Sequence, residues 1–95
     1  MKNVFIVSGA PGNGKTTYVK NHKKAGDLVI DLDYICAALQ LETNAHANHD
    51  SVWRMAVCAR DSLYPFIANR FGDCNDCWIV TAEARQDKLK ELARM

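Results

Sequence analysis

Short continuous apolar runs alternate along the chain with longer segments in which apolar residues recur at helical spacing. The short runs are rich in β-branched and aromatic residues and predict strands buried on both faces at 4–8, 28–30 and 78–80. The longer segments predict helices from Lys15 to about Lys24, from Asp33 to Leu41, from Asp50 or Ser51 to about Arg70, and around Leu89, Leu92 and Ala93. Strands that alternate with helices indicate an α/β fold, with a parallel sheet covered by helices on both faces.

Individual residues mark where these helices begin, end or bend. Gly26 is expected to stop the first helix, and Asp33 is expected to cap the second. Pro65 lies inside the longest helix, where we expect a kink or a local break. One stripe of that helix has the spacing of a core face and comprises Val52, Met55, Ala56, Ala59, Leu63, Phe66 and Ile67.

The length, composition and charge of the chain limit the classes of protein to which it can belong. Residues 1–95 are enough for one small domain, and 48% hydrophobic with 24% charged residues is typical of a globular core. A net charge of +1 argues against a generally basic surface for nucleic acid. The apolar run at 4–7 is too short for a signal peptide or a membrane span, so we expect a cytoplasmic protein with no membrane association. In that compartment the four cysteines are expected to be reduced thiols, with Cys36 and Cys58 packed as small apolar side chains.

A glycine-rich segment stands between the first predicted strand and the first predicted helix. It matches the motif G-x-x-x-x-G-K-[ST] at every fixed position. Glycines let the backbone amides turn inward around a phosphate, Lys15 supplies a cation for the β- and γ-phosphates, and Thr16 offers a hydroxyl to magnesium. The alternative is a chance glycine-rich turn, which the strand-to-helix setting disfavours. The expected nucleotide-binding set is Gly9, Ala10, Pro11, Gly12, Asn13, Gly14, Lys15, Thr16 and Thr17.

Two carboxylates follow the second predicted strand, in the sequence Leu28–Asp33. The carboxyl ends of parallel strands are where open α/β sheets bind ligands. We expect Asp31 to hold the magnesium shell together with Thr16, and Asp33 to act as the base that accepts a proton from an acceptor hydroxyl. The alternatives are a solvated strand end for Asp31 and a plain helix cap for Asp33.

The segments 4–18 and 29–34, V-F-I-V-S-G-A-P-G-N-G-K-T-T-Y and V-I-D-L-D-Y, resemble the opening of the P-loop kinases, a group that includes phage polynucleotide kinases and shikimate kinase. The resemblance implies a three-layer parallel sheet of the P-loop NTPase type, with ATP and Mg²⁺ as cofactors. It also implies that the acid in the place of Asp33 activates the acceptor hydroxyl.

Such kinases continue with two more strands and an arginine-bearing lid, which the 95 residues do not supply, so we expect a truncated three-stranded core. The resemblance places the first strand beside the third and leaves the Val4–Ser8 edge open. We therefore expect either that the chain is a fragment or that a second copy or a partner protein covers this edge.

Arginines are expected to neutralise charge during phosphoryl transfer. Arg60, on a half-covered face of the long helix, and Arg85, after the third strand, are equally consistent with this role and with a solvated one. For Arg54 a solvated face is the favoured interpretation.

Two further groups have a functional and a structural interpretation. His46 and His49 with Cys74 and Cys77 have the spacings of a zinc site, but a lone C-x-x-C is weak and half-buried thiols are favoured. Tyr18, Trp53 and Tyr64 are candidates to stack on a base, with core packing the favoured role.

These residues predict a kinase-like phosphotransferase that moves phosphate from ATP to a hydroxyl of a nucleotide, a nucleic-acid end or a small metabolite. The alternative is a nucleotide-binding module that is non-catalytic or only hydrolyses ATP, and that completes its sheet with a partner.

Overall fold

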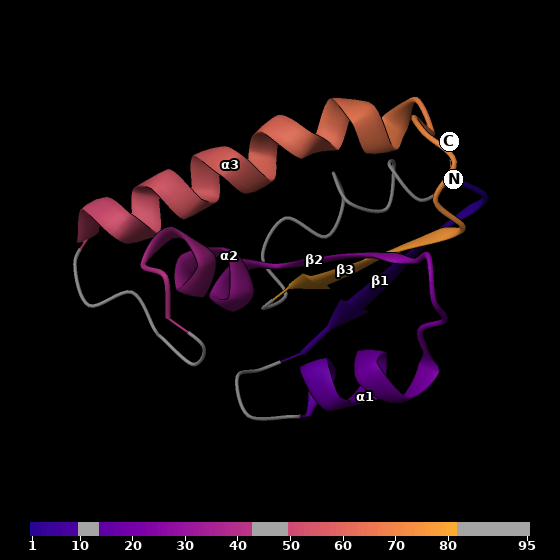
Figure 1. The fold of residues 1–95 in the computed structure, drawn as a ribbon, viewed down its shortest axis with the longest axis horizontal. Coiled ribbons are helices and arrows are strands. Elements are labelled where there is room, and N and C mark those ends of the chain that lie inside the picture. Colours follow the sequence, from indigo (N-terminus) through magenta and orange to yellow (C-terminus); the bar gives the residue numbers. More distant parts are fainter. Residues whose placement is uncertain (10–13, 43–49, 82–95) are drawn as a thin grey trace.

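Six elements make up the computed structural model, which describes residues 1–9, 14–42 and 50–81. They are β1 (Asn3–Ser8), α1 (Lys15–His22), β2 (Leu28–Asp31), α2 (Leu32–Leu39), α3 (Asp50–Ala68) and β3 (Asp76–Thr81) (Figure 1). Every strand and helix expected in these ranges is therefore confirmed, but the expected burial of β1 and β2 on both faces is wrong. Phe5 is 40% exposed, Leu28 38% and Val29 36%, because these two strands lie on the outside of the three-stranded sheet. The helix expected around Leu89 and Leu92 lies outside the described residues.

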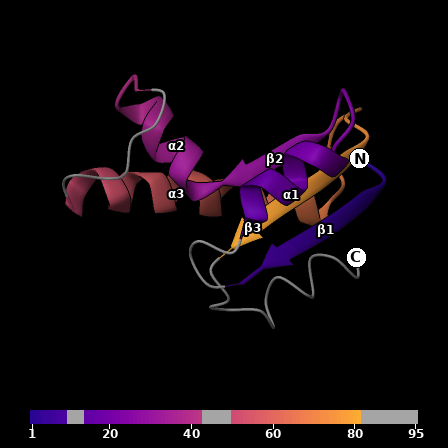
Figure 2. The ribbon, with the colours of Figure 1, turned by 90° about the horizontal axis from the view of Figure 1, so that it is seen from below.

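The three strands form one parallel sheet in the order β1-β3-β2 (Figure 2). Central β3 pairs with both neighbours and is buried from Cys77 to Val80, as its uninterrupted apolar run requires. The expected position of β1 beside β3 is confirmed. The register sets Ser8 opposite Thr81, and Asp31 opposite Val80, so all three strands end at one edge.

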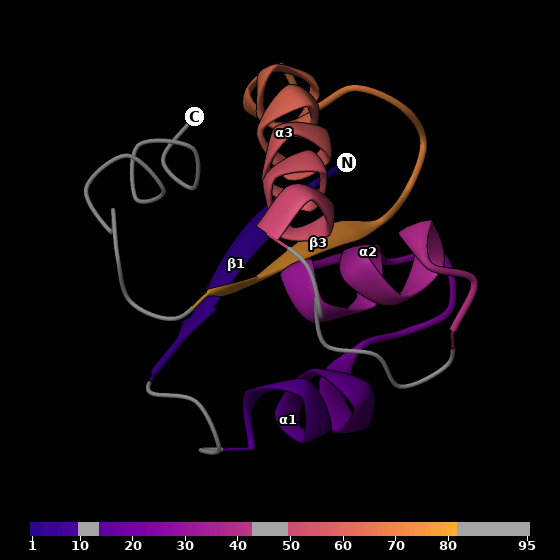
Figure 3. The same cartoon turned by 90° about the vertical axis from the view of Figure 1, so that its left-hand side faces the viewer.

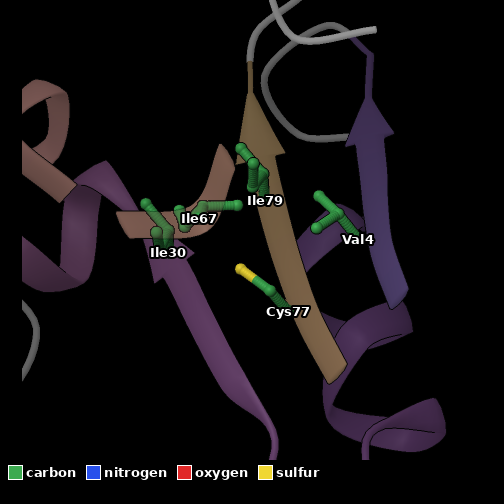
Figure 4. Close-up of a cluster of buried hydrophobic side chains, with 5 residues drawn as sticks. All are labelled: Val4, Ile30, Ile67, Cys77 and Ile79. Carbon is green, nitrogen blue, oxygen red and sulfur yellow. The ribbon is translucent and has the colours of Figure 1, made fainter. Parts of the chain in front are cut away.

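Helices cover both faces of the sheet, with α1 on one side and α2 and α3 on the other (Figure 3). On the α3 face, Ile67 packs among sheet residues in a cluster of Val4, Ile30, Ile67, Cys77 and Ile79 (Figure 4). On the α1 face, Val19 packs against Trp78 and Val80. Alternate β3 residues thus serve opposite faces, and the expected arrangement of two helical layers is confirmed.

The first two helices end earlier than predicted. α1 ends at His22, because Lys23 turns to an extended conformation, and Gly26 lies in the following turn with a φ of 90°. α2 ends at Leu39, and Leu41 adopts a left-handed φ of 56° that a helix cannot continue through. Both differences are of two residues and leave the strands in place.

The predicted core stripe of α3 is only partly correct. Ala56 and Ile67 are buried and Val52 and Ala59 are half-buried, but Met55, Leu63 and Phe66 are exposed. α3 contacts the sheet and α2 through one narrow side only. The predicted stripe of seven residues is wider than this contact surface, so some of its members stay exposed.

Pro65 does not break α3, contrary to one of the two outcomes expected for it. The helix runs through to Ala68, and the Pro65 carbonyl accepts hydrogen bonds from the Asn69 amide at 3.2 Å and from Asn69 Nδ2 at 2.9 Å. Proline removes one helical donor but keeps its acceptor, so the turn that follows can still close.

The Asp27 carboxylate ties the turn before β2 to the start of β3. It accepts hydrogen bonds from the Lys24 amide at 2.9 Å, Trp78 Nε1 at 3.0 Å and the Asp76 amide at 3.2 Å. These bonds, the Lys24 amide first, hold the pKa of Asp27 below its ordinary value. The connection lies at the sheet edge opposite to the strand ends described above.

No helix among the described residues combines the length and the apolar composition needed to cross a bilayer.

Candidate functional site

The first helix begins at the carboxyl end of the sheet without a side-chain cap. Gly14 holds the cap position in a left-handed conformation, with φ 74° and ψ 23°, which glycine adopts without strain. The first helical hydrogen bond joins the Tyr18 amide to the Gly14 carbonyl at 2.9 Å, so the amides of residues 15–17 precede the helical ladder. Such amides, with the positive end of the helix dipole, are suited to bind an anion.

Lys15 is the first residue of α1, and its side chain reaches back to the residue that follows β1. Lys15 Nζ donates a hydrogen bond of 2.5 Å to the carbonyl of Gly9, which directly follows β1. The ammonium group is therefore held between the end of β1 and the start of α1, where the motif requires a cation. The intervening candidates Ala10, Pro11, Gly12 and Asn13 lie outside the described residues, and Thr17 is exposed in the first turn.

Asp31 connects the first helix to the second strand and the second helix. Its side chain is 5% exposed, and its Oδ2 accepts a hydrogen bond of 2.9 Å from the Thr16 hydroxyl. Its Oδ1 accepts a hydrogen bond of 3.0 Å from the Asp33 amide. The structure thus brings together Thr16 and Asp31, the two residues expected to serve the metal.

The cap of α2 is Asp31, so the expectation that Asp33 caps this helix is wrong. α2 begins at Leu32, two residues earlier than a cap at Asp33 implies, and Asp33 is its second residue. The side chain of an N-cap accepts from the amide two or three residues on, which is the position of Asp33. Asp33 itself is exposed in the first turn, where a negative charge is favourable to the helix dipole.

The oxygen atoms of Thr16 and Asp31 suit a hard divalent cation. The hydroxyl donates its proton to the carboxylate, which leaves the oxygen lone pairs of Thr16 available, and Asp31 contributes a buried carboxylate. Mg²⁺ is usually bound through one or two protein oxygens together with water and phosphate. This donor set fits that pattern.

The arginines differ in their surroundings. The Arg60 side chain is 17% exposed, donates from Nε and Nη2 to Asp61 Oδ1 at 3.2 Å, and lies with Cζ 5.9 Å from the Tyr64 ring centre. Its half-covered position on α3 is confirmed, and its role at a phosphate stays a prediction. Arg54 forms an exposed ion pair of 2.7 Å with Asp50, which confirms its solvated face. Arg85 lies outside the described residues.

The cysteines behave mainly as packing residues. Cys36 and Cys77 are fully buried, and burial raises the pKa of the Cys77 thiol to about 12. Cys77 therefore belongs to the core, which disfavours the zinc alternative, and Cys74 is half-buried as favoured. Across residues 1–9, 14–42 and 50–81, no three histidine, cysteine or acidic side chains gather at one point. His46 and His49 lie beyond these ranges. Cys58 is exposed, so its expected packing is wrong.

The aromatic candidates are more exposed than expected. Tyr18 is 49% exposed and stacks on His22 with ring centres 4.1 Å apart, and Trp53 is 44% exposed. Core packing is wrong for these two. Tyr64 packs against the cluster on the α3 face, as expected. Helical periodicity places a side chain on a face but does not show whether a neighbour covers it.

A hollow beside the Thr16–Asp31 pair was not anticipated from the sequence. It is also lined by Lys20, Lys23 and Tyr34. Helical spacing sets Thr16 and Lys20 on one face of α1, which is the part of this surface that the sequence can indicate, whereas the hollow itself depends on how α1 lies against β2.

Comparisons of the chain with protein-family models, curated proteins and solved structures find no match. The structure itself shows a small α/β domain with a three-stranded, all-parallel sheet. At the carboxyl edge of this sheet, an uncapped helix start, a lysine, a hydroxyl and a buried carboxylate lie together.

Proposed function

We propose that this chain binds a magnesium nucleoside triphosphate at the carboxyl edge of its sheet and is a kinase-like phosphotransferase of the P-loop type. The observation that carries the proposal is the hydrogen bond between Thr16 and Asp31. It joins the last residue of the phosphate-loop motif to a buried carboxylate at a strand end. A chance glycine-rich turn gives no reason for that pairing.

Each residue of the edge has a distinct part in nucleotide binding. The amides at the start of α1 and the Lys15 ammonium bind the phosphates, because both present positive charge at the same helix terminus. Thr16 would bind Mg²⁺ through its hydroxyl oxygen, and Asp31 would hold a magnesium-bound water through its carboxylate. Mg²⁺, when bound, neutralises part of the triphosphate charge.

For transfer, the acceptor oxygen forms a bond to the γ-phosphorus while the bond from that phosphorus to the ADP oxygen breaks. The proton of the acceptor hydroxyl passes to the Asp33 carboxylate, which is exposed in the first turn of α2. Arg60 and Arg85 neutralise charge on the transferred group.

The alternative is a module that binds or hydrolyses nucleotide without an acceptor. The position of β1 favours it, since within the described part of the chain β1 pairs with β3 alone and Phe5 is 40% exposed. An unpaired strand edge is a place for a second copy or a partner to add a strand.

Calorimetric titration with MgATP tests the proposal. In Lys15→Ala we expect affinity to fall on the order of 10–100-fold, the loss of charge-assisted hydrogen bonds to phosphate. Lys2→Ala is the matched control, because exposed Lys2 carries the same charge near the opposite edge of the sheet. Binding that is absent, or unchanged in Lys15→Ala, contradicts the proposal.

ATP consumption with and without candidate acceptors then separates the two functions. Acceptor-dependent turnover that Asp33→Asn abolishes supports the phosphotransferase. Tight binding with no turnover, or turnover that ignores every acceptor, supports the module.

A further inference from the structure

A hollow of about 210 Å³ lies between α1 and β2, on the face of the sheet opposite α3. Its walls are the side chains of Val19, Val29 and Val80. Val29 and Val80 alternate along their strands with Ile30 and Ile79, which pack on the other face, so the direction of each valine follows from the strand pleat. The hollow is open on one side and mainly apolar.

Two lysines also line the hollow. Lys20 stands one turn beyond Thr16 on α1, and Lys23 directly follows the end of that helix. Lys20 Nζ lies 5.5 Å from the ring centre of Tyr34 on α2, and a hydrogen bond with Tyr34 raises the pKa of Lys20. The ammonium group therefore stays charged beside an apolar wall, an arrangement suited to an organic anion.

The hollow continues to the candidate nucleotide site, because Thr16 and Asp31 line it as well. Their hydrogen-bonding groups lie where Asp31 ends β2, and the lysines lie toward the far end of α1. A molecule in the hollow thus meets positive charge at one part of its length and the proposed metal and phosphate residues at another.

Size limits what the hollow can hold. An engineered apolar cavity of about 150 Å³ holds benzene, whereas sites for drug-sized ligands measure roughly 300–1,000 Å³. At about 210 Å³ the hollow suits a single ring or a branched body with one or two small polar groups. A nucleoside or a nucleic-acid end would extend out of its open side.

We propose that the hollow between α1 and β2 binds the phosphoryl acceptor, a small organic anion with a compact apolar body and one hydroxyl group. Its anionic group lies at Lys20 and Lys23, and its hydroxyl points to the edge where Thr16 and Asp31 meet. This identification as an acceptor rests on the proposed function, whereas binding of the anion does not. Transfer follows the balance given above, with the hydroxyl proton passing to Asp33 and ADP leaving.

Binding is tested with 4-(hydroxymethyl)benzoate by calorimetry and by the methyl NMR signals of Val29 and Val80. Benzoate keeps the charge and lacks the hydroxyl, and 1,4-benzenedimethanol keeps hydroxyls and lacks the charge. We expect saturable binding of both acids, shifts of the two valine signals, and affinity for the neutral diol about tenfold lower, as expected for a lost charge-assisted hydrogen bond.

Two pairs of variants locate the site. Val29→Phe fills the hollow and is expected to abolish binding, whereas Leu28→Phe, on the other face of the same strand, leaves it unchanged. Lys23→Gln is expected to weaken binding about three- to tenfold, and Lys24→Gln, which does not line the hollow, to leave it unchanged. Unfolding midpoints of all four variants show that each one folds.

MgATP titration of the same samples separates failure of this inference from failure of the proposed function. MgATP binding without saturable acid binding, or acid binding that Val29→Phe leaves intact, overturns the acceptor site alone. Acid binding with no MgATP binding overturns the nucleotide proposal and the acceptor role. Transfer of phosphate to 4-(hydroxymethyl)benzoate that is lost in Val29→Phe supports both.

Discussion

Two helices begin at the same edge of the sheet and begin in different ways. α1 starts at Gly14, which has no side chain to cap it, so the amides of residues 15–17 stand before the helical ladder. α2 starts at Asp31, whose carboxylate accepts a hydrogen bond from the Asp33 amide. One first-turn amide of α2, that of Asp33, is satisfied by a side-chain cap, whereas no side chain caps the first turn of α1.

The two helix starts therefore have different parts in the proposed site: the start of α1 is the proposed anion site, and the start of α2 positions the Asp31 carboxylate. The start of α1 leaves its positive end without a side-chain cap, and this is where we propose that the phosphates bind. The cap of α2 fixes the Asp31 carboxylate, and its other oxygen then receives the Thr16 hydroxyl from α1. Asp31 therefore caps α2 and also contacts α1 through Thr16, whereas the start of α1 has no side-chain cap of its own.

The largest expected effect comes from replacing Asp31, the cap of α2. Asp31→Ala loses the cap and leaves the Thr16 hydroxyl without its partner, so we expect the free energy of unfolding to fall by about 1–3 kcal/mol. Asp31→Asn keeps a good capping residue but loses the charge. For Asp31→Asn we expect stability within about 1 kcal/mol of the original and a loss of Mg²⁺-dependent nucleotide affinity on the order of 10–100-fold.

Urea unfolding and MgATP titration of both variants measure these effects. If Asp31→Asn binds MgATP as tightly as the original chain, capping is the whole role of this carboxylate and the division between the two helix starts fails.

The second-largest expected effect comes from replacing Gly14, at the uncapped start of α1. Alanine at Gly14 must adopt a φ of 74°, which costs about 1–2 kcal/mol. Gly72→Ala is a matched control, since Gly72 has a φ of 87° and equally open space around a built Cβ. We expect similar losses of stability from the two variants, measured by urea unfolding. MgATP titration is expected to show weaker binding in Gly14→Ala alone, because only Gly14 positions the amides of α1. Equal nucleotide affinity in the two variants would count against an anion site at α1.

The smallest expected effect is at the opposite edge of the sheet, where a change at Asp27 should alter stability without altering nucleotide binding. The pKa of Asp27, at the other edge, is lowered by hydrogen bonds, so its stabilising contribution is complete above its ordinary pKa of 3.8 and is lost as pH falls through the lower folded value. We expect the unfolding midpoint to drop less steeply below about pH 4 in Asp27→Asn than in the original chain. Nucleotide affinity at neutral pH is expected to stay the same. An identical pH profile in the two proteins would contradict the assigned role of Asp27.

The sequence predicted the elements well because strands and helices have different periods. The apolar runs at 4–8, 28–30 and 78–80 became the three parallel strands, and β3, apolar at every position from Cys77 to Val80, lies at the centre. The pairing of Thr16 with Asp31 also followed, since both residues directly adjoin strand or helix ends that share one edge.

What the sequence missed depends on which surfaces meet. Met55, Leu63 and Phe66 have core spacing, yet α3 rests on a narrower side and leaves them exposed. The cap moved from Asp33 to Asp31 because α2 begins at Leu32, and two acidic residues spaced by one are equally good caps in the sequence. The hollow at Val29 required the relative placement of α1 and β2, which no local pattern contains.

The pairing of β1 with β3 joins residues 3–8 to residues 76–81. β1 therefore cannot form its hydrogen bonds with β3 until residues 76–81 have been synthesised. During synthesis, β1 leaves the ribosome long before its partner exists, and closing so long a loop carries an entropic cost before any contact repays it. The segment that carries Lys15 therefore gains a rigid base only once almost the whole described chain has been made. Folding that depends on so distant a pairing is expected to be slow for a chain of this size, and nucleotide added early should accelerate it little.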